Sequence, residues 1–188
     1  MLSTTEKLNL MVERLSDKSF LKSEKLSNEL PFYIFDYKPE EELVVRYKTK
    51  QIIDELKINK NIKVAEFNLY QILIEHLEKK KVLDKVPNME LEQGFENLIE
   101  NMAPLLNPKI YIDQIKESVA KVDIIFLTGV GSVWPFLRSH SVLNNLHPIV
   151  DNIPLVMFYP GKWDKTSLNL FNKFKDDNYY RAFSLFES

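Results

Sequence analysis

A nearly continuous apolar run near residue 125 constrains the fold of this chain more than any other feature. Residues 122–128 read Val-Asp-Ile-Ile-Phe-Leu-Thr, and the turn Gly-Val-Gly-Ser at 129–132 follows at once. A strand that is apolar on both faces is typical of a parallel sheet covered by helices on both sides, where neither face meets water. We therefore expect every side chain from Ile124 to Leu127 to be buried at the centre of a layered domain.

Further strand-like segments alternate with helix-like segments along the 188 residues. Aromatic and β-branched runs predict strands at 32–37, 62–67, 122–128, 154–159 and 179–186. Apolar residues at helical spacing predict helices at 3–16, 40–56, 68–80, 89–103, 109–120, 135–146 and 167–173. Strands joined through helices favour parallel pairing, so we predict an α/β, three-layer domain with a mainly parallel sheet of about five strands, Rossmann- or RecA-like but without a P-loop.

The length of the chain suits one domain with a substantial core. Within this domain, residues from about 1 to 30 are expected to form an N-terminal helical arm, and residues from about 79 to 121 a helical insertion. In the helix at 40–56 one set of apolar residues is expected to face inward. This set comprises Leu43, Tyr47, Ile52, Ile53 and Leu56.

Composition argues against several classes of function. The formal net charge is -2 with both signs interspersed, so no global basic field favours nonspecific DNA binding. Because the chain has no cysteine, disulfides, thiolate metal sites and cysteine nucleophiles are excluded. Neither a signal-peptide pattern nor an apolar stretch of roughly 18 residues is present. We expect a cytoplasmic protein without a cofactor or metal, since His76, His140 and His147 lack a metal-ligand spacing.

The glycine motif at 129–131 resembles a dinucleotide fingerprint only in part. Gly129-Val-Gly131 lies between a predicted strand and a predicted helix, as the fingerprint requires, but Trp134 occupies the third glycine position. A tight turn from strand to helix is the favoured interpretation. The alternative is an anion held by Gly129, Gly131 and Ser132 at the helix N-terminus.

Two other motifs fall short of a catalytic site. Gly161-Lys162 lacks the earlier glycine of a P-loop and is followed by Trp163 in place of Ser or Thr, so hydrolysis of ATP or GTP by that route is not expected. His140 stands between two serines, but the Gly-x-Ser-x-Gly elbow is missing. We expect His140 and Arg138 to hydrogen-bond to neighbouring elements or to a partner.

A surface for partner binding is the main hypothesis that the residues themselves support. Trp, Tyr and Arg dominate the energetics of protein interfaces. The hypothesised surface comprises Trp134, Arg138, His140, Lys162, Trp163, Tyr179, Tyr180 and Arg181. We expect Trp163 and Arg181 to act in partner binding and not in folding. In the competing interpretation, Trp163 caps the core after the fourth strand and Arg181 pairs with Asp176 or Asp177.

Long motifs in the last third of the chain point to a family. They are Phe126–Leu146, Pro154–Lys162 and Lys175–Phe183, and Phe35–Pro39 adds a fourth. With these motifs in order, the chain resembles the BrxB family of BREX defence islands, long catalogued as a domain of unknown function. The resemblance spans nearly the whole chain. It implies a protein encoded beside a DNA methyltransferase, a large ATPase and an alkaline-phosphatase-like PglZ protein.

The resemblance carries over no catalytic residues and no established activity. The leading hypothesis is therefore a non-catalytic adaptor that binds PglZ and links it to the methyltransferase and ATPase subunits. Such a protein reaches DNA only through the complex and contacts no membrane. Two alternatives stay open. One is a degenerate nucleotide-binding domain in which the turn at Gly129–Ser132 holds a nucleotide without hydrolysing it, and the other is a subunit that contacts DNA through local Lys and Arg side chains.

Overall fold

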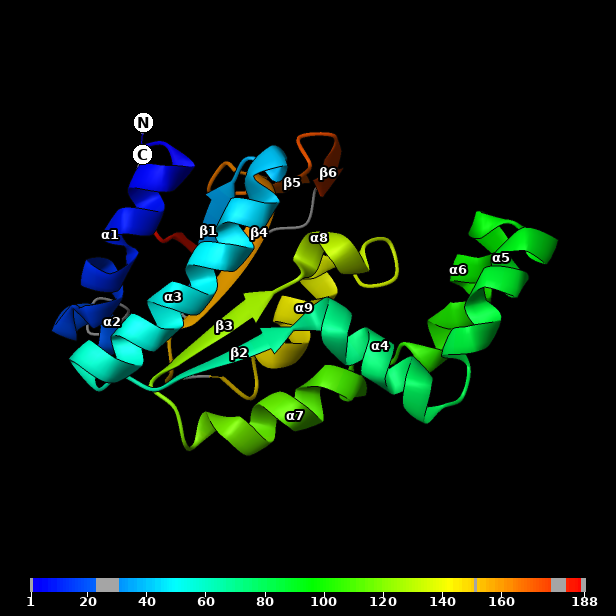
Figure 1. Cartoon of the computed structure of the whole chain (residues 1–188), viewed down its shortest axis with the longest axis horizontal. Coiled ribbons are helices and arrows are strands. Elements are labelled where there is room, and N and C mark those ends of the chain that lie inside the picture. Colours follow the sequence, from blue (N-terminus) through cyan, green and yellow to red (C-terminus); the bar gives the residue numbers. More distant parts are fainter. Residues whose placement is uncertain (1, 23–30, 151, 177–181, 187–188) are drawn as a thin grey trace.

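The computed structural model describes residues 2–22, 31–150, 152–176 and 182–186, which form a sheet with helices on both sides (Figure 1). The strands are β1 (Phe32–Tyr37), β2 (Val64–Asn68), β3 (Ile124–Thr128), β4 (Leu155–Trp163), β5 (Leu168–Leu170), β6 (Phe174–Asp176) and β7 (Phe183–Ser184). The α-helices are α1 (Thr4–Ser16), α2 (Lys18–Leu21), α3 (Glu42–Lys60), α4 (Leu69–Lys79), α5 (Val86–Gln93), α6 (Phe95–Met102), α7 (Lys109–Val119), α8 (Val130–Val133) and α9 (Ser139–Leu146). Short 3₁₀ helices are η1 (Pro39–Glu41), η2 (Leu83–Lys85) and η3 (Ala103–Leu105).

The sheet is mixed and open. Neighbouring strands pair in parallel in the order β2-β3-β4-β1-β7, and β5 and β6 form a hairpin that pairs antiparallel with the end of β4. The predicted α/β class, with helices flanking the sheet, is confirmed. Dinucleotide-binding folds have the strand order 3-2-1-4-5-6, which differs from the order found here. The Rossmann- or RecA-like detail is therefore not confirmed.

The two faces of the sheet build two cores. On one face α1 and α3 cover aromatic side chains of the central strands, and the ring of Phe158 lies 5.2 Å from that of Phe35 and 5.0 Å from that of Phe126, between centroids. On the other face α4, α7, α8 and α9 cover side chains such as Ile125. Every side chain from Ile124 to Leu127 is 0% exposed. This result confirms the prediction that the strand is covered on both faces.

Helix α3 turns a different face to the core from the one predicted. Its buried residues are Val45, Thr49, Ile52 and Leu56. The last two lie inward as predicted and Ile53 is partly buried, but Leu43 is 77% and Tyr47 64% exposed, so the inward assignment of these two is wrong. Thr49 tolerates its buried position because its hydroxyl donates to the Val45 carbonyl at 2.8 Å. Leu43 and Tyr47 near the start of α3 therefore lie on the surface, whereas Val45 between them faces the core.

The last third of the chain corrects two predicted helices. Helix α9 begins at Ser139 and not at 135, after Arg138 with an extended backbone. The helix predicted at 167–173 is wrong, because this segment forms β5 and a turn in which Phe171 and Asn172 have φ of 54° and 58°. Right-handed helices contain no such dihedrals. Of the strand predicted at 179–186, the structure shows β7, and residues 179–181 lie outside the described residues.

Helices α5 and α6 project from the rest of the molecule (Figure 1). The single helix predicted at 89–103 is divided at Gly94, whose φ is 80°. The ring of Phe95 at the start of α6 meets that of Phe136 edge-on, 6.4 Å away between centroids. Helix α7, by contrast, buries Tyr111 completely in the core. The helical insertion at 79–121 and the N-terminal arm remain predictions as units, and α5 and α6 are the part of that segment that projects.

Candidate functional site

A cavity of about 320 Å³ lies where β2 and β3 end and α3 begins. It is named here the α3 cleft, and its polar lining includes Arg46, Lys50, Glu66, Asn68, Gln71 and Thr128. Strand β1 leads into α3 on one face of the sheet, whereas β3 leads into α8 on the other. Ligands of open α/β sheets bind outside the carboxyl ends of strands that leave toward opposite faces. The α3 cleft occupies such a place.

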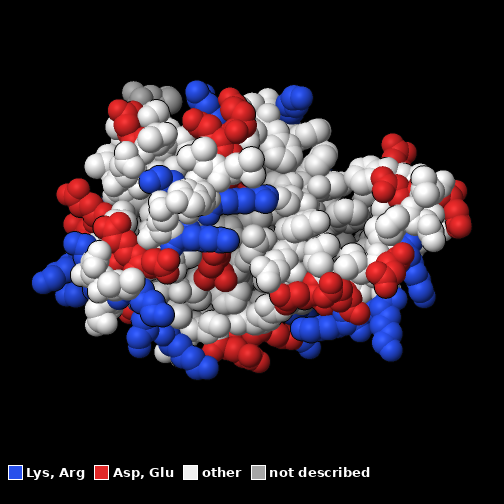
Figure 2. Space-filling view, in the orientation of Figure 1, with Lys and Arg blue, Asp and Glu red and all other residues white. Residues whose placement is uncertain are grey.

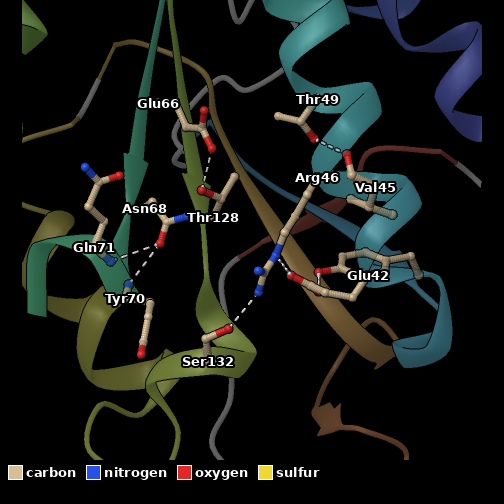
Figure 3. A network of polar contacts seen from close by, with 11 residues as sticks. Glu42, Val45, Arg46, Thr49, Glu66, Asn68, Tyr70, Gln71, Thr128 and Ser132 are labelled. Carbon is tan, nitrogen blue, oxygen red and sulfur yellow. Dashed lines mark hydrogen bonds and ion pairs between the residues drawn. The ribbon is translucent and has the colours of Figure 1, made fainter. Parts of the chain in front are cut away.

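Arg46 crosses one side of the cleft from α3 toward α8 (Figure 3). Its Nε donates to Glu42 Oε1 at 2.6 Å, and its Nη2 donates to Ser132 Oγ at 2.9 Å. The Tyr37 hydroxyl donates to the other oxygen of Glu42. Burial, and then the Glu42 carboxylate, raises the pKa of Tyr37 far above its usual value, so this hydroxyl remains a donor. Glu42 thus fixes the guanidinium from one side while Ser132 receives it on the other.

The opposite wall of the cleft comes from the ends of β2 and β3. Thr128 Oγ1 donates to Glu66 Oε1 at 2.7 Å. Asn68 Oδ1 accepts from the backbone N–H groups at the start of α4 and caps that helix. A Cβ on Gly129 would lie 2.4 Å from Asn68 Oδ1, and the φ of Gly129 is 71°. The close approach and the positive φ both require glycine at this position.

Gly131 is explained by packing as well. A Cβ on this residue would lie 2.7 Å from Pro160 Cγ and 2.9 Å from Phe171 Cε1, so α8 approaches the β4–β5 hairpin closely only with glycine here. The favoured interpretation of the motif as a tight strand-to-helix turn agrees with this geometry. An anion bound by Gly129, Gly131 and Ser132 remains an untested prediction.

Two of the residues predicted to bind a partner, Trp134 and His140, contact side chains of the β5–β6 hairpin. The rings of Trp134 and Phe174 are 4.2 Å apart between centroids, and His140 Nδ1 lies 3.1 Å from Asp176 Oδ2. Arg138 is exposed just before α9. Trp134 and His140 therefore make contacts within the chain, one by packing and the other through a polar contact, and these contacts fix the segment before β4.

The predicted pair Lys162 and Trp163 lies elsewhere, at the end of β4. Lys162 is exposed at a second cavity of about 530 Å³, which Lys7 and Asp36 also line with an ion pair of 2.6 Å. Trp163 is only 6% exposed and packs in the core of the α4 face. This burial, together with the pairing of its strand with β5, agrees with the competing interpretation in which Trp163 caps the core, and its role in partner binding stays a prediction. Tyr179, Tyr180 and Arg181 lie outside the described residues.

Sequence reasoning missed Arg46, Glu66 and Thr128. Glu66 and Thr128 stand at the carboxyl ends of predicted strands, so the rule for ligand sites in α/β sheets could have selected them. Arg46 carried no such signal, because the periodicity of α3 did not determine which face of the helix was buried.

The described residues contain neither a candidate metal site nor a candidate membrane span. In these residues no group of three or more His, Cys, Asp or Glu side chains is placed to hold a metal ion. None of the helices seen in the same parts of the chain has the length and apolar character needed to cross a membrane.

Comparisons with known proteins agree on one family. The family model described as BREX protein BrxB matches residues 65–185. A BREX protein BrxB of Bacillus cereus (strain H3081.97) is 42% identical over 186 residues, which cover 97% of either chain. Another, from Escherichia coli O9:H4 (strain HS), is 35% identical over 181 residues, covering 95% of this chain and 90% of the relative. No solved structure matches the chain significantly.

Proposed function

The chain belongs to the BrxB family of BREX proteins, and we propose that it serves its BREX system as a non-catalytic adaptor. In this role it binds the PglZ protein and links it to the methyltransferase and ATPase subunits. The names of its relatives denote a BREX component and no enzyme activity, which agrees with an adaptor. Contact with DNA is then indirect. Figure 2 shows acidic and basic side chains interspersed over the displayed face, an arrangement that does not favour binding of the extended phosphate backbone of DNA there.

The observation that carries the proposal is an apolar patch at the start of α3. Leu43, Val44 and Tyr47 are 77%, 48% and 64% exposed and fall within little more than one turn of the helix. We name these three residues the α3 patch. Contiguous exposed apolar side chains mark interaction sites, and tyrosine is enriched among the residues that dominate binding. A partner that covers this patch would remove the apolar surface from water.

Capture of PglZ by the tagged chain tests the adaptor role. Leu43→Ala combined with Tyr47→Ala is expected to weaken capture from cells expressing the whole defence island by about tenfold, or on the order of 1.4 kcal/mol. The melting temperature should stay nearly unchanged, because both side chains are exposed. Ile58→Ala is the matched control, since Ile58 is 78% exposed on the same helix but outside the patch. Full capture by the double variant would rule out the α3 patch as the PglZ surface.

A further inference from the structure

We propose that the α3 cleft binds a nucleotide. The cleft stands at the carboxyl ends of β1, β2 and β3. Strand β1 leads into α3 on one face of the sheet, and β2 and β3 lead into α4 and α8 on the other, which is where α/β proteins place their ligands. Its volume of about 320 Å³ lies at the small end of the range for ligand cavities, which suits one nucleotide and not a dinucleotide.

One end of the cleft offers cations to a phosphate group. The Arg46 guanidinium is held across the cleft by Glu42 and Ser132, so it is positioned before any ligand arrives. Lys50 follows one turn later on α3 and also lines the cleft. Within the described residues Lys50 has no acidic partner, so its ammonium group is available to an incoming anion. A guanidinium and an ammonium together are the usual ligands of phosphate oxygens.

The other end of the cleft offers hydrogen-bond acceptors. Glu66 receives the Thr128 hydroxyl on one oxygen, and its second oxygen can accept from a sugar hydroxyl or an exocyclic amine. The Gln71 side chain donates to Glu75, which leaves its carbonyl oxygen as a further acceptor near the cleft. Figure 3 shows Glu66 and Gln71 on the sheet side of the space and Arg46 on the helix side.

The acidic and basic side chains that line the α3 cleft together favour a nucleotide over a simple anion. Two carboxylates, Glu42 and Glu66, line the same cleft as Arg46 and Lys50, so the cleft is not strongly positive. A simple anion meets Arg46 already paired with Glu42 and gains little from Glu66. A nucleotide places its phosphate at the cationic end and its donor groups at Glu66, and so uses both ends. Phe158, which is 1% exposed, adds an apolar residue to the lining of the cleft.

Calorimetric titration of the purified chain tests this proposal with defined probes. The four common nucleoside monophosphates, the matching nucleosides and inorganic phosphate are titrated separately. We expect at least one nucleoside monophosphate to bind at least about tenfold more tightly than its nucleoside or phosphate alone. Phosphate that binds as tightly as every nucleotide, or no detectable binding of any nucleotide at millimolar concentration, would overturn the proposal.

Substitutions in the cleft assign the binding to its two ends. Lys50→Gln is expected to weaken nucleotide binding by about tenfold without loss of stability, because Lys50 holds no other described element. Arg46→Gln should weaken it further, and Glu66→Gln should weaken nucleotide binding more than phosphate binding. Lys57→Gln is the matched control, since Lys57 is an exposed residue of α3 that does not line the cleft.

Binding that survives Lys50→Gln and Arg46→Gln unchanged would contradict the assigned site even if a nucleotide binds. The outcome is independent of PglZ capture, because Leu43 and Tyr47 do not line the cleft. A folded protein that binds nucleotide but fails to capture PglZ would contradict the adaptor proposal and support nucleotide binding in the α3 cleft.

Discussion

The indole ring of Trp134 packs on the phenyl ring of Phe174, with the centroids 4.2 Å apart and the ring planes inclined by 30°. Trp134 follows α8 and Phe174 opens β6, so this contact joins the segment before α9 to the β5–β6 hairpin. His140 at the start of α9 and Asp176 at the end of β6 add a second contact to the hairpin, 3.1 Å apart. An aromatic contact and a polar contact thus help to hold the hairpin against the body of the protein.

Removing the outer ring of the aromatic pair should loosen this attachment. We expect Phe174→Ala to lower the free energy of unfolding by about 0.5–1.5 kcal/mol, because Phe174 is 44% exposed and contributes through its ring contacts with Trp134 and Phe171. Urea denaturation measures the loss. Phe174→Tyr retains the ring and should unfold like the wild type, and an equal loss in both variants would show that the aromatic contact is not what stabilises the hairpin.

Replacing Trp163 by Ala should destabilise the fold. Its ring is 6% exposed in the core, so truncation leaves a cavity and costs roughly 3–5 kcal/mol. Urea denaturation followed by circular dichroism measures this cost. Lys162→Ala, at the exposed neighbouring position of β4, serves as the control and should change the unfolding midpoint little. A Trp163→Ala protein of unchanged stability would restore the view that Trp163 acts only toward a partner.

Phe126 provides the corresponding test for the sheet. It is 0% exposed and its ring lies 5.0 Å from that of Phe158, so Phe126→Ala should reduce the free energy of unfolding by roughly 3–5 kcal/mol. Leu43→Ala removes apolar atoms of similar kind from a side chain that is 77% exposed, and should cost far less. Similar losses for the two variants would contradict burial of β3 beneath α1 and α3.

The turn at 164–167 should make stability depend on pH. Hydrogen bonds from the Ser167 backbone, and then from the Thr166 and Ser167 hydroxyls, hold the pKa of Asp164 well below its usual value of about 3.9. A depressed carboxyl pKa stabilises the folded state fully above the unfolded pKa, and this contribution fades as the pH falls through the folded pKa. Asp164→Ala should therefore melt below the wild type at neutral pH.

Below about pH 4 the difference in melting temperature between the wild type and Asp164→Ala should become smaller, because the wild-type carboxylate takes up a proton. Thermal melts at a series of pH values measure this difference. Asp164→Asn keeps one acceptor oxygen and should melt between the wild type and the Ala variant at neutral pH. A gap that persists unchanged into strong acid would show that the carboxylate hydrogen bonds are not its cause.

The buried strands were predictable because their burial leaves a local signal. At 32–37 and 124–127 apolar side chains point to both faces, and composition alone reports that. The β5–β6 hairpin was not predictable in this way. The spacing of its apolar residues fits a short helix equally well. The segment forms a strand because Leu168 and Leu170 pair with β4 and because Asp164 holds the turn between the two strands. This pairing with the preceding strand depends on the conformation of the turn between them, which the spacing of apolar residues at 167–173 does not report.

The candidate site shows the same division. Trp134 and His140 could be selected by residue type, but their partners Phe174 and Asp176 stand on β6, a strand that was not predicted. Arg46 could not be selected, because the rotation of α3 about its axis depends on packing against α1 and the sheet. Residue type could thus select candidate side chains, but which of them come into contact depends on the tertiary structure.

The place of β1 in the sheet imposes an order of events during synthesis. Strand β1 is made before every other strand, yet it lies between β4 and β7, with Phe32 paired to Leu155 and Tyr33 to Phe183. Until the last third of the chain has left the ribosome, this aromatic segment has neither neighbour, and its open edge can pair with other chains. During synthesis β1 is therefore unpaired and prone to aggregation until β4 and β7 are available. Because the parallel pairs join strands far apart in the sequence, we expect the sheet to form slowly.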